Sequence, residues 1–437
     1  MSLTTPDKVG KLQATLHAKA KDSPEFRFYS LYDKIYRTDV LDFAYRCCKA
    51  NGGAPGVDGQ DFIDIESYGK EKWLGELAKE LREKRYSPQA VRRVWIPKPN
   101  GKKRPLGIPT IRDRVVQMAA VIILEPIFEA DLQPEQYAYR KERNAHEAIR
   151  KLHKLVNTGH NEVVDADLSG YFDSIPHSEL MRSVARRVSD GQMLHLIKMW
   201  LEMPVEEDDD EGNTQRTTRA RDEGEGTPQG APISPLLANI YMRRFILAWK
   251  RLGFERKLAA CIVNYADDFV ICCKGTAERA AGVMRQIMEK LKLTVNEEKT
   301  SIRKLPEESF DFLGYTIGKC YSPKNGRCYI GTKPSRKRVE RMFDSIRGLT
   351  GPEHTTSSET EIVGSLNRRL VGWANYFCLG PVSSAYRAVD AHVGKRLRQW
   401  LRRKYKRKSG KYRCWPDEYF EEKLGLVRLS KRSRNFS

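Results

Sequence analysis

Two adjacent aspartates, Asp267 and Asp268, lie between two apolar runs of β-prone residues. Residues 261–263 precede the pair and residues 269–272 follow it, a pattern that predicts a strand, a tight turn and a second strand. Two full charges about 5 Å apart repel by roughly 3 kcal/mol at an effective dielectric constant near 20, so a positive partner has to offset them. Hard oxygen ligands on a rigid turn suit Mg²⁺. An isolated pair also fits a solvated turn, so other segments must decide.

A second acidic segment begins as an apolar strand and continues into a loop or helix. Its residues Asp165 and Asp167 share one face of the predicted strand, because side chains alternate along a strand. Burying two carboxylates beside valines is costly without a metal or a cationic partner. A two-metal site for phosphoryl transfer takes its acids from more than one segment, which favours Asp167 as a further ligand. Solvent exposure of Asp165 and a helix-capping role for Asp173 are the simpler alternatives.

A basic hairpin is predicted between residues 94 and 110, where two extended arms flank Asn100-Gly101. Its turn carries four cations, Lys98, Lys102, Lys103 and Arg104. A tip of this charge can reach a triphosphate, and an exposed loop kept soluble by its charge is the alternative.

Two further segments have residue types that suit a nucleotide site. Residues 226–235 form a Gly/Pro loop before an apolar helix predicted from Leu236 to Trp249, and the backbone of such a loop is open to a phosphate or a base. The alternative is a simple helix entry. Lys299 follows an amphipathic helix predicted over residues 277–293 and is a possible proton donor, although an exposed lysine is the commoner case.

The C-terminal hundred residues change to helical patterns, at residues 335–349, 359–377 and 384 to about 406. Ser358 and Glu361 fit a capping box at the start of the second helix. Residues 395–413 hold eleven basic residues and no acid, which favours a helix with one apolar face and one face that meets phosphate over a merely solvated basic face. The candidate nucleic-acid contacts are Lys395, Arg396, Arg398, Arg402, Arg403 and Lys404.

Composition narrows the class of protein. A chain of 437 residues can hold two or three domains, and its formal net charge of +21 points to a polyanionic partner such as nucleic acid. We expect no membrane association, because no apolar run reaches the roughly 18 residues of a membrane span and no signal peptide is evident. Nine cysteines without a CxxC pair argue against a disulfide framework and a zinc site.

The order and the amino-acid sequences of several motifs resemble those of a reverse transcriptase, and more closely those of the maturase reverse transcriptases of bacterial and organellar group II introns. The motifs are residues 96–99, 104–109, 167–173, 226–230, 234–239, 265–268 and 312–315. Residues 372–377, Gly-Trp-Ala-Asn-Tyr-Phe, resemble the thumb or maturase domain of that family. The resemblance covers roughly residues 40 to 405. Ala231-Pro232 departs modestly from the Gly-rich sequence that usually follows Pro-Gln-Gly in this family.

The resemblance implies a role for each motif residue. Asp167, Asp267 and Asp268 would be the catalytic acids at a site for two Mg²⁺ ions, with Asp268 maintaining the shape of the site more than binding metal. The dNTP would be contacted by Lys98, Arg104, Phe172, Gln229 and Lys299. Phe172 stands at the family's aromatic gate, where a ring packed under the sugar leaves no room for a 2′-hydroxyl. The product is therefore expected to be DNA.

The expected fold is α+β, a right-hand polymerase whose fingers and palm contain an antiparallel palm sheet, followed by a three-helix thumb or maturase domain. The expected divisions are residues 1–95 (N-terminal extension and first fingers segment), 96–330 (fingers and palm), 331–408 (thumb) and 409–437 (basic tail). Since no cysteine pairs of an HNH endonuclease are present, second-strand cleavage is not expected. Insertion would then rely on single-stranded targets, hairpin DNA or replication forks.

The expected function is RNA-directed DNA synthesis combined with maturase binding of a structured group II intron RNA, which assists splicing and retrohoming. The other expected partners are an RNA template with a DNA primer or target DNA, in a ribonucleoprotein of the bacterial cytoplasm. Three rivals remain. A splicing-only RNA-binding factor is disfavoured by the intact acids, and an RNA-dependent RNA polymerase is disfavoured by Phe172. A free-standing reverse transcriptase of a defence or CRISPR locus would share the same chemistry. The sequence leaves the oligomeric state open.

Overall fold

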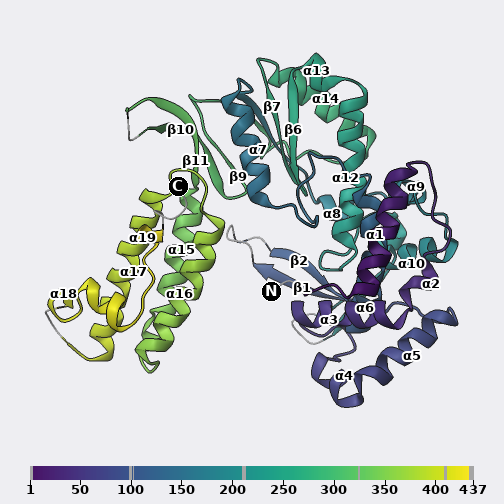
Figure 1. The fold of residues 1–437 in the computed structure, drawn as a ribbon, viewed down its shortest axis with the longest axis horizontal. Helices are drawn as coiled ribbons and strands as arrows, with labels where there is room; N and C mark the ends of the chain where they lie inside the picture. Colours follow the sequence, from purple (N-terminus) through teal and green to yellow (C-terminus); the bar gives the residue numbers. More distant parts are fainter. Residues whose placement is uncertain are drawn as a thin grey trace.

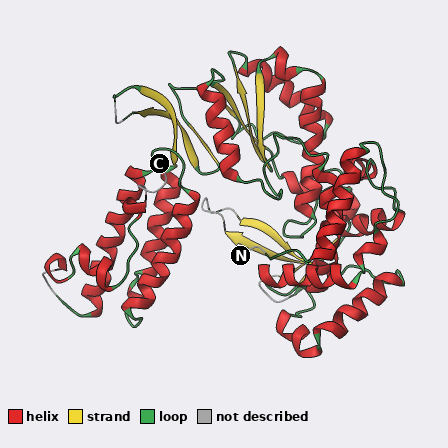
Figure 2. Ribbon diagram, in the orientation of Figure 1, coloured by secondary structure: helices red, strands yellow, loops and turns green. Residues whose placement is uncertain are grey.

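The computed structural model describes residues 3–97, 101, 103–208, 213–322, 325–407 and 411–432. Figure 1 shows three parts, which we name fingers, palm and thumb. The fingers comprise the helices before residue 130 with a small sheet, the palm surrounds a second sheet, and the thumb is the helical part after residue 335. Figure 2 shows that strands are confined to the fingers, the palm and the connection to the thumb. The mixture of helix and antiparallel sheet confirms the predicted α+β class.

The palm sheet has four antiparallel strands in the order β6-β7-β3-β8. Its strands are β3 (Glu162–Asp167), β6 (Ala260–Tyr265), β7 (Asp268–Cys273) and β8 (Ser301–Lys304). Helices α12 (Ser234–Arg251) and α14 (Ala277–Lys290) pack on the face that carries Phe269 and Ile271. Helix α7 (Ala145–Asn157) packs on the opposite face, with Val270 and Cys272. Because helices cover both faces of the sheet, residues 269–272 of β7 form an unbroken apolar run in the sequence.

The fingers combine helices with the basic hairpin. The hairpin strands are β1 (Val91–Pro97) and β2 (Lys103–Ile108), which pair antiparallel as predicted, and β4 (Val205–Asp208) and β5 (Thr214–Thr217) extend the sheet in the order β2-β1-β4-β5. The helices are α1 (Asp7–Asp22), α2 (Tyr32–Ile35), α3 (Thr38–Asn51), α4 (Phe62–Tyr68), α5 (Lys70–Arg82) and α6 (Ile111–Glu129). Helix α6 is buried on nearly all sides and forms the centre of this part.

Shorter helices connect the longer elements of the fingers and the palm. They are α8 (Tyr171–Ser174), α9 (His177–Ala185), α10 (Gly191–Leu201), α11 (Arg219–Glu223) and α13 (Phe254–Lys257). A three-stranded sheet, β11-β10-β9, leads to the thumb and consists of β9 (Phe310–Phe312), β10 (Tyr315–Tyr321) and β11 (Cys328–Pro334).

The thumb is a bundle of α15 (Arg336–Leu349), α16 (Glu359–Tyr376) and α17 (Ser383–Lys404), close to the three predicted helices. The capping box at Ser358 and Glu361 is present. The end of α16 joins the thumb to the palm side. The hydroxyl of Tyr376 donates to the carbonyl of Leu313 at 2.8 Å, and its own carbonyl lies 2.6 Å from His146 Nε2. The Gly-Trp-Ala-Asn-Tyr-Phe motif therefore supplies the joint between thumb and palm.

The C-terminal segment belongs to the thumb core. It contains α18 (Lys411–Cys414), a π-helical turn (Tyr419–Lys423) and α19 (Leu429–Arg432). Trp415, Phe420 and Leu429 are buried in the same cluster as the inner faces of α16 and α17. The division expected at residue 408 thus does not coincide with a break in packing. None of the helices in the described part of the chain is both long and apolar enough to span a membrane.

This packing predicts the effect of truncating a C-terminal side chain. Phe420 is 1% exposed, so Phe420→Ala should leave a cavity and destabilise the thumb by about 3–5 kcal/mol. Phe420→Leu retains most of the volume and should cost clearly less. Hydrogen exchange of the α17 amides measures the local free energy of opening. Unchanged protection in Phe420→Ala would mean that this segment is an independent tail.

Candidate active site

Strand register brings the two acidic segments together. Asp167 at the end of β3 lies directly opposite Asp268 at the start of β7, and Asp165 lies opposite Val270. Residues that face each other in an antiparallel pair point to the same side of the sheet, so Asp165, Asp167 and Asp268 share one face. Asp267 sits in the turn that links β6 to β7.

The turn is tightened by its own sequence. Ala266 adopts a left-handed backbone conformation with φ of 60°, which is uncommon for a residue with a side chain. The buried amide of Asn264 donates to the carbonyl of Ala266 at 2.7 Å and holds the turn closed. The local sequence therefore fixes where Asp267 and Asp268 begin the second strand.

The face carries more negative charge than its neighbours neutralise. Burial raises the pKa of Asp268 to about 7, and the charges of three nearby carboxylates, Asp165, Asp267 and Asp167, add to that rise. Burial also raises the pKa of Asp165 to about 6, although the guanidinium of Arg303 opposes the shift. This site favours an additional cation.

Lys299 forms an ion pair with one of these acids. Its ammonium lies 2.8 Å from Asp167 Oδ2, and the amide of Asn296 donates to the same oxygen at 3.3 Å. The alternative, that Lys299 is an exposed lysine, is also partly correct, since its side chain is 64% exposed. Lys299 thus joins the acidic face rather than standing apart from it.

The donor set fits a hard divalent cation by its chemistry. The candidate ligands are carboxylate oxygens on adjacent strand ends, which suit Mg²⁺. Within the described ranges, no three His, Cys, Asp or Glu side chains converge closely enough to form a ready-made metal cluster. The contact of Asp167 with Lys299 is consistent with that, because it turns one carboxylate oxygen toward the ammonium.

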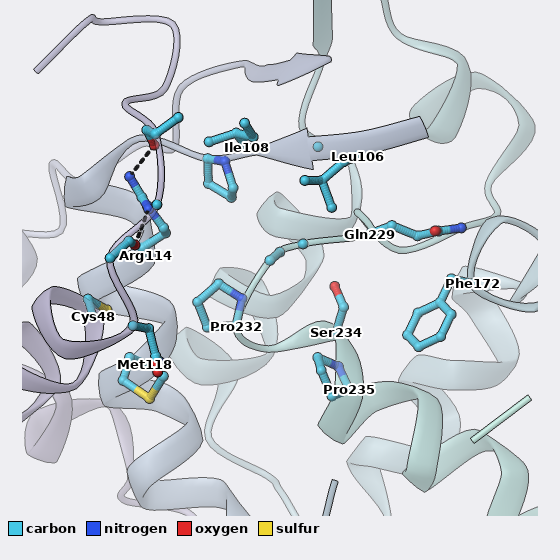
Figure 3. A pocket seen from close by; sticks show the side chains of 18 of the residues that line it. Cys48, Leu106, Ile108, Arg114, Met118, Phe172, Gln229, Pro232, Ser234 and Pro235 are labelled. Atoms are coloured by element: carbon cyan, nitrogen blue, oxygen red, sulfur yellow. Dashed lines mark hydrogen bonds between the residues drawn. The ribbon is translucent and has the colours of Figure 1, made fainter. Parts of the chain in front are cut away.

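A cavity of about 440 Å³ lies between the fingers and the N-terminal end of α12. Figure 3 shows Phe172 and Gln229 on one side of it, Pro232 and Ser234 along its floor, and Arg114 on the far side. Arg104 and Tyr139 also line it. We call it the nucleotide pocket, after the role that we propose for it.

Close backbone packing forms one wall of this pocket. The amide of Gly107 donates to the carbonyl of Gln229 at 2.7 Å, which ties the 226–235 loop to strand β2. Gly230 has φ of 112°, and a Cβ there would lie 2.5 Å from the Gly107 carbonyl oxygen. Only glycine fits that position, so the loop in this motif is more than a helix entry.

Two aromatic rings define the inner end of the pocket. Phe172 is buried, and the ring of Tyr139 meets it edge-on with 6.5 Å between centroids. Tyr139 has a left-handed φ of 54° and is 51% exposed. Neither periodicity nor composition distinguishes Tyr139 from the residues around it, so the sequence does not predict its place in the pocket.

A hydrogen-bonded chain connects the basic hairpin to the second acidic segment. Arg104 Nε donates to Gln229 Oε1 at 3.0 Å, and Gln229 Nε2 donates to Asp173 Oδ2 at 3.0 Å. Asp173 therefore fixes which end of the Gln229 amide faces Arg104, and it does not cap a helix. The only sequence signal for this role is that Asp173 closes the motif that starts at Asp167.

The remaining predicted contacts divide into groups. Lys98 lies outside the described residues. Lys395, Arg402 and Arg403 are exposed on α17. Arg396 donates to Thr350 Oγ1 at 3.0 Å, and Lys404 donates to the Ser357 carbonyl at 2.9 Å.

Arg398 differs most from the expected solvent-facing cation. It is 6% exposed, donates to the Trp415 carbonyl at 2.9 Å and pairs with Asp417. Its guanidinium connects α17 to the C-terminal segment and so contributes to the fold. Counting basic residues in the sequence cannot distinguish such an arginine from one that binds RNA.

These features are those of a template-directed polymerase, and comparison with known families agrees. Residues 96–317 match the family model described as "Reverse transcriptase (RNA-dependent DNA polymerase)", so the chain belongs to the reverse transcriptase family. Residues 339–418 match the model described as "Group II intron, maturase-specific domain". The chain thus combines a reverse transcriptase domain with a group II intron maturase domain, as the motifs predicted.

Several curated relatives are similar to this chain over most of its length. Protein YkfC of Escherichia coli is 33% identical over 366 residues, which cover 75% of this chain and 93% of that protein. The group II intron-encoded protein LtrA of Lactococcus lactis is 30% identical over 66% of this chain but only 57% of its own length. The putative COX1/OXI3 intron 1 protein of Saccharomyces cerevisiae is 27% identical over 66% of this chain and 39% of its own length.

The chain of hydrogen bonds through Gln229 gives a kinetic prediction. Asp173→Ala removes the acceptor of the Gln229 amide, so KM for dNTP should rise roughly fivefold, as expected for about 1 kcal/mol of hydrogen bonding, with kcat little changed. Asp173→Asn retains an acceptor oxygen and should restore most of the affinity. Steady-state single-nucleotide extension separates the two constants. An equal fall of kcat in both variants would contradict this positioning role.

Proposed function

We propose that this chain copies RNA into DNA with Asp167, Asp267 and Asp268 as the acids that hold two Mg²⁺ ions, and that it acts as a maturase on group II intron RNA. The observation that carries the proposal is the register that sets Asp167 opposite Asp268. Reverse transcriptases as a family depend on a divalent metal, and the excess negative charge on this face supports the same requirement here.

The reaction joins the primer 3′-oxygen to the α-phosphorus of the dNTP, releases the hydroxyl proton and expels pyrophosphate. Bound Mg²⁺ would activate the 3′-hydroxyl and neutralise charge on the leaving pyrophosphate. Asp167 and Asp268 would orient the ions from adjacent strand ends, and Lys299 would balance the remaining charge. Most of the catalysis would come from positioning and electrostatics.

The walls of the nucleotide pocket would bind the dNTP. Arg104, with Lys98 of the same hairpin, would contact the triphosphate, and Gln229 would line the sugar and base side. Phe172 would lie beneath the sugar and reject a 2′-hydroxyl by steric overlap. This arrangement supports DNA as the product and argues against the RNA polymerase alternative.

The maturase role is supported by the match to the maturase-specific domain and by the basic surface of the thumb. Lys395, Arg402 and Arg403 are exposed on α17 and would contact RNA phosphates. In this proposal the protein assists splicing and retrohoming of its intron within a ribonucleoprotein of the bacterial cytoplasm. An RNA template with a DNA primer or target DNA would occupy the polymerase site.

A free-standing defence or CRISPR-associated reverse transcriptase remains the second candidate, because it would use the same acids. The terminal RNA domains of an intron flanking the reading frame would favour the maturase, and their absence would favour the second candidate.

Substitution of one acid tests the polymerase proposal. Asp267→Ala should lower cDNA synthesis on an RNA template by on the order of 10²- to 10³-fold, because a site that stabilises developing charge loses a ligand. Asp344→Ala, on the surface of the thumb with a side chain 64% exposed, is the matched control and should remain active. Equal cDNA yields from wild type and Asp267→Ala would refute the assignment. Splicing assistance that survives in Asp267→Ala would show that the two activities are separable.

Substitution of the gate tests the choice of product. Phe172→Ala should reduce discrimination between dNTP and rNTP by roughly tenfold or more, since the pocket gains room for the 2′-hydroxyl. Phe172→Tyr retains the ring and should discriminate like the wild type. Single-turnover incorporation of dGTP and rGTP measures the ratio. If wild type and Phe172→Ala admit ribonucleotides equally, the ring does not act as the gate.

A further inference from the structure

A second cavity, of about 400 Å³, lies between α9, α12 and the end of α6. Its lining includes four arginines, Arg182, Arg186, Arg243 and Arg244, and two acids, Asp131 and Glu179. We call it the arginine cavity. None of its lining residues belongs to the nucleotide pocket.

The two sites lie at different levels of the same helix. Ser234, at the start of α12, lines the nucleotide pocket, whereas Arg243 lines the arginine cavity roughly 14 Å further along at about 1.5 Å per residue. In Figure 1, α9 and α12 lie on the side of the palm away from the thumb helices. A ligand in the arginine cavity would therefore leave the space between palm and thumb free.

The acids of the cavity are already engaged. Glu179 pairs with Arg182 at 2.9 Å and with Arg244 at 2.8 Å. Asp131 Oδ2 lies 3.4 Å from Nε of Arg187, an arginine that is 1% exposed and also donates to the carbonyl of Ser23 at 3.1 Å. Both carboxylates are thus already paired with arginines: Asp131 with the buried Arg187, and Glu179 with Arg244 and the exposed Arg182.

Among the residues that the structure describes, the other two arginines have no carboxylate partner. Arg243 Nε donates to the backbone carbonyl of Asp131 at 2.6 Å, which supplies no negative charge. Arg186 is exposed; its backbone N–H donates to the carbonyl of Val184, but its guanidinium makes neither a hydrogen bond nor an ion pair within the described ranges. With Arg187 included, five arginines meet two carboxylates, so the cavity keeps an excess of three positive charges.

The excess positive charge acts on Arg243. Burial lowers the pKa of Arg243, and although Asp131 opposes the shift, the charges of Arg186, Arg251 and Arg187 add to it. A bound anion would relieve that repulsion. The planar guanidinium fork matches the two free oxygens of a phosphodiester, and Arg186 and Arg243 have such donors available.

We propose that the arginine cavity binds the phosphodiester backbone of a structured RNA while the polymerase site is occupied by template and primer. The proposal rests on the proposed function only in taking RNA as the partner. The net charge of +21 favours a polyanion in general, and the distance of the cavity from the nucleotide pocket allows both sites to be filled together. An acidic protein segment is the other ligand class that could neutralise these arginines.

The test uses the full-length protein preloaded with a saturating, unlabelled RNA template and DNA primer duplex. A fluorescently labelled RNA hairpin is then titrated at several KCl concentrations. Arg186→Glu should weaken hairpin binding by roughly three- to tenfold and reduce the slope of log K against log salt by about one, as for the loss of one phosphate contact. Arg279→Glu, an exposed arginine on α14 outside the cavity, is the matched control and should change neither value.

Primer extension on the preloaded duplex is measured in the same samples. Because Arg186 lies outside the catalytic and nucleotide-binding residues, extension should be unchanged in Arg186→Glu. Equal hairpin affinity in Arg186→Glu and Arg279→Glu would overturn the proposal, even if extension is normal. Absence of extension in the wild type would instead count against the polymerase assignment and leave the hairpin result interpretable.

A second variant and a second probe make the test decisive. Arg243→Gln keeps a donor for the Asp131 carbonyl but removes the charge, and it should reproduce the loss of hairpin affinity. Polyglutamate of matched charge tests the acidic-protein alternative. If polyglutamate binding falls in both variants while hairpin binding does not, the cavity is a protein site and the RNA proposal fails.

Discussion

The packing of like charges on one face of the palm sheet is the constraint on which the site depends. Asp165, Asp167 and Asp268 share that face because β3 and β7 pair in a single register. A shift by one residue would move every side chain of a strand to the other face. Covering helices on both sides oppose such a shift, since it would exchange Phe269 and Val270 between two different apolar clusters. The core therefore maintains an electrostatically unfavourable arrangement that a cation can use.

The sequence carried enough information to place these acids, because strand and turn signals are local. The apolar runs around Asp267 and the Asn100-Gly101 hairpin follow from side-chain alternation and turn chemistry. The three thumb helices follow from their apolar spacing. The family resemblance then connected segments that local patterns leave unrelated.

Contacts between distant segments could not be predicted in the same way. The hydrogen bonds from Arg104 through Gln229 to Asp173 join three segments, and no periodicity encodes the direction of an amide side chain. Tyr139 owes its place to a left-handed backbone that nothing in its neighbours requires. The C-terminal segment is expected to be a basic tail because of its charged residues. Trp415, Phe420, Leu426 and Leu429 nevertheless bury it in the thumb core.

Arginine is the residue type for which sequence alone is least informative. Arg398 and Arg187 are nearly buried and satisfy backbone carbonyls and carboxylates, so their charge serves the fold. The guanidinium of Arg186 carries the same charge without such a partner among the residues that the structure describes. A guanidinium that is already paired gains little from a phosphate, whereas an unpaired one in a region of excess positive charge gains the full attraction. The partners of each arginine, rather than their number, therefore identify which surfaces remain available to nucleic acid.

Separate binding surfaces would be useful to a protein that both copies an RNA template and binds a structured RNA. Phosphate binding by exposed cations is independent of sequence, so one basic groove would admit a folded RNA and a primer–template duplex in competition. Helix α12 provides a rigid separation, with the nucleotide pocket at its first turn and the arginine cavity near its middle. A folded RNA held in the arginine cavity could remain bound during synthesis, because the two sites share no lining residue. Because both RNAs carry the same phosphate groups, only the different positions of the two sites along α12 can keep the RNAs from competing.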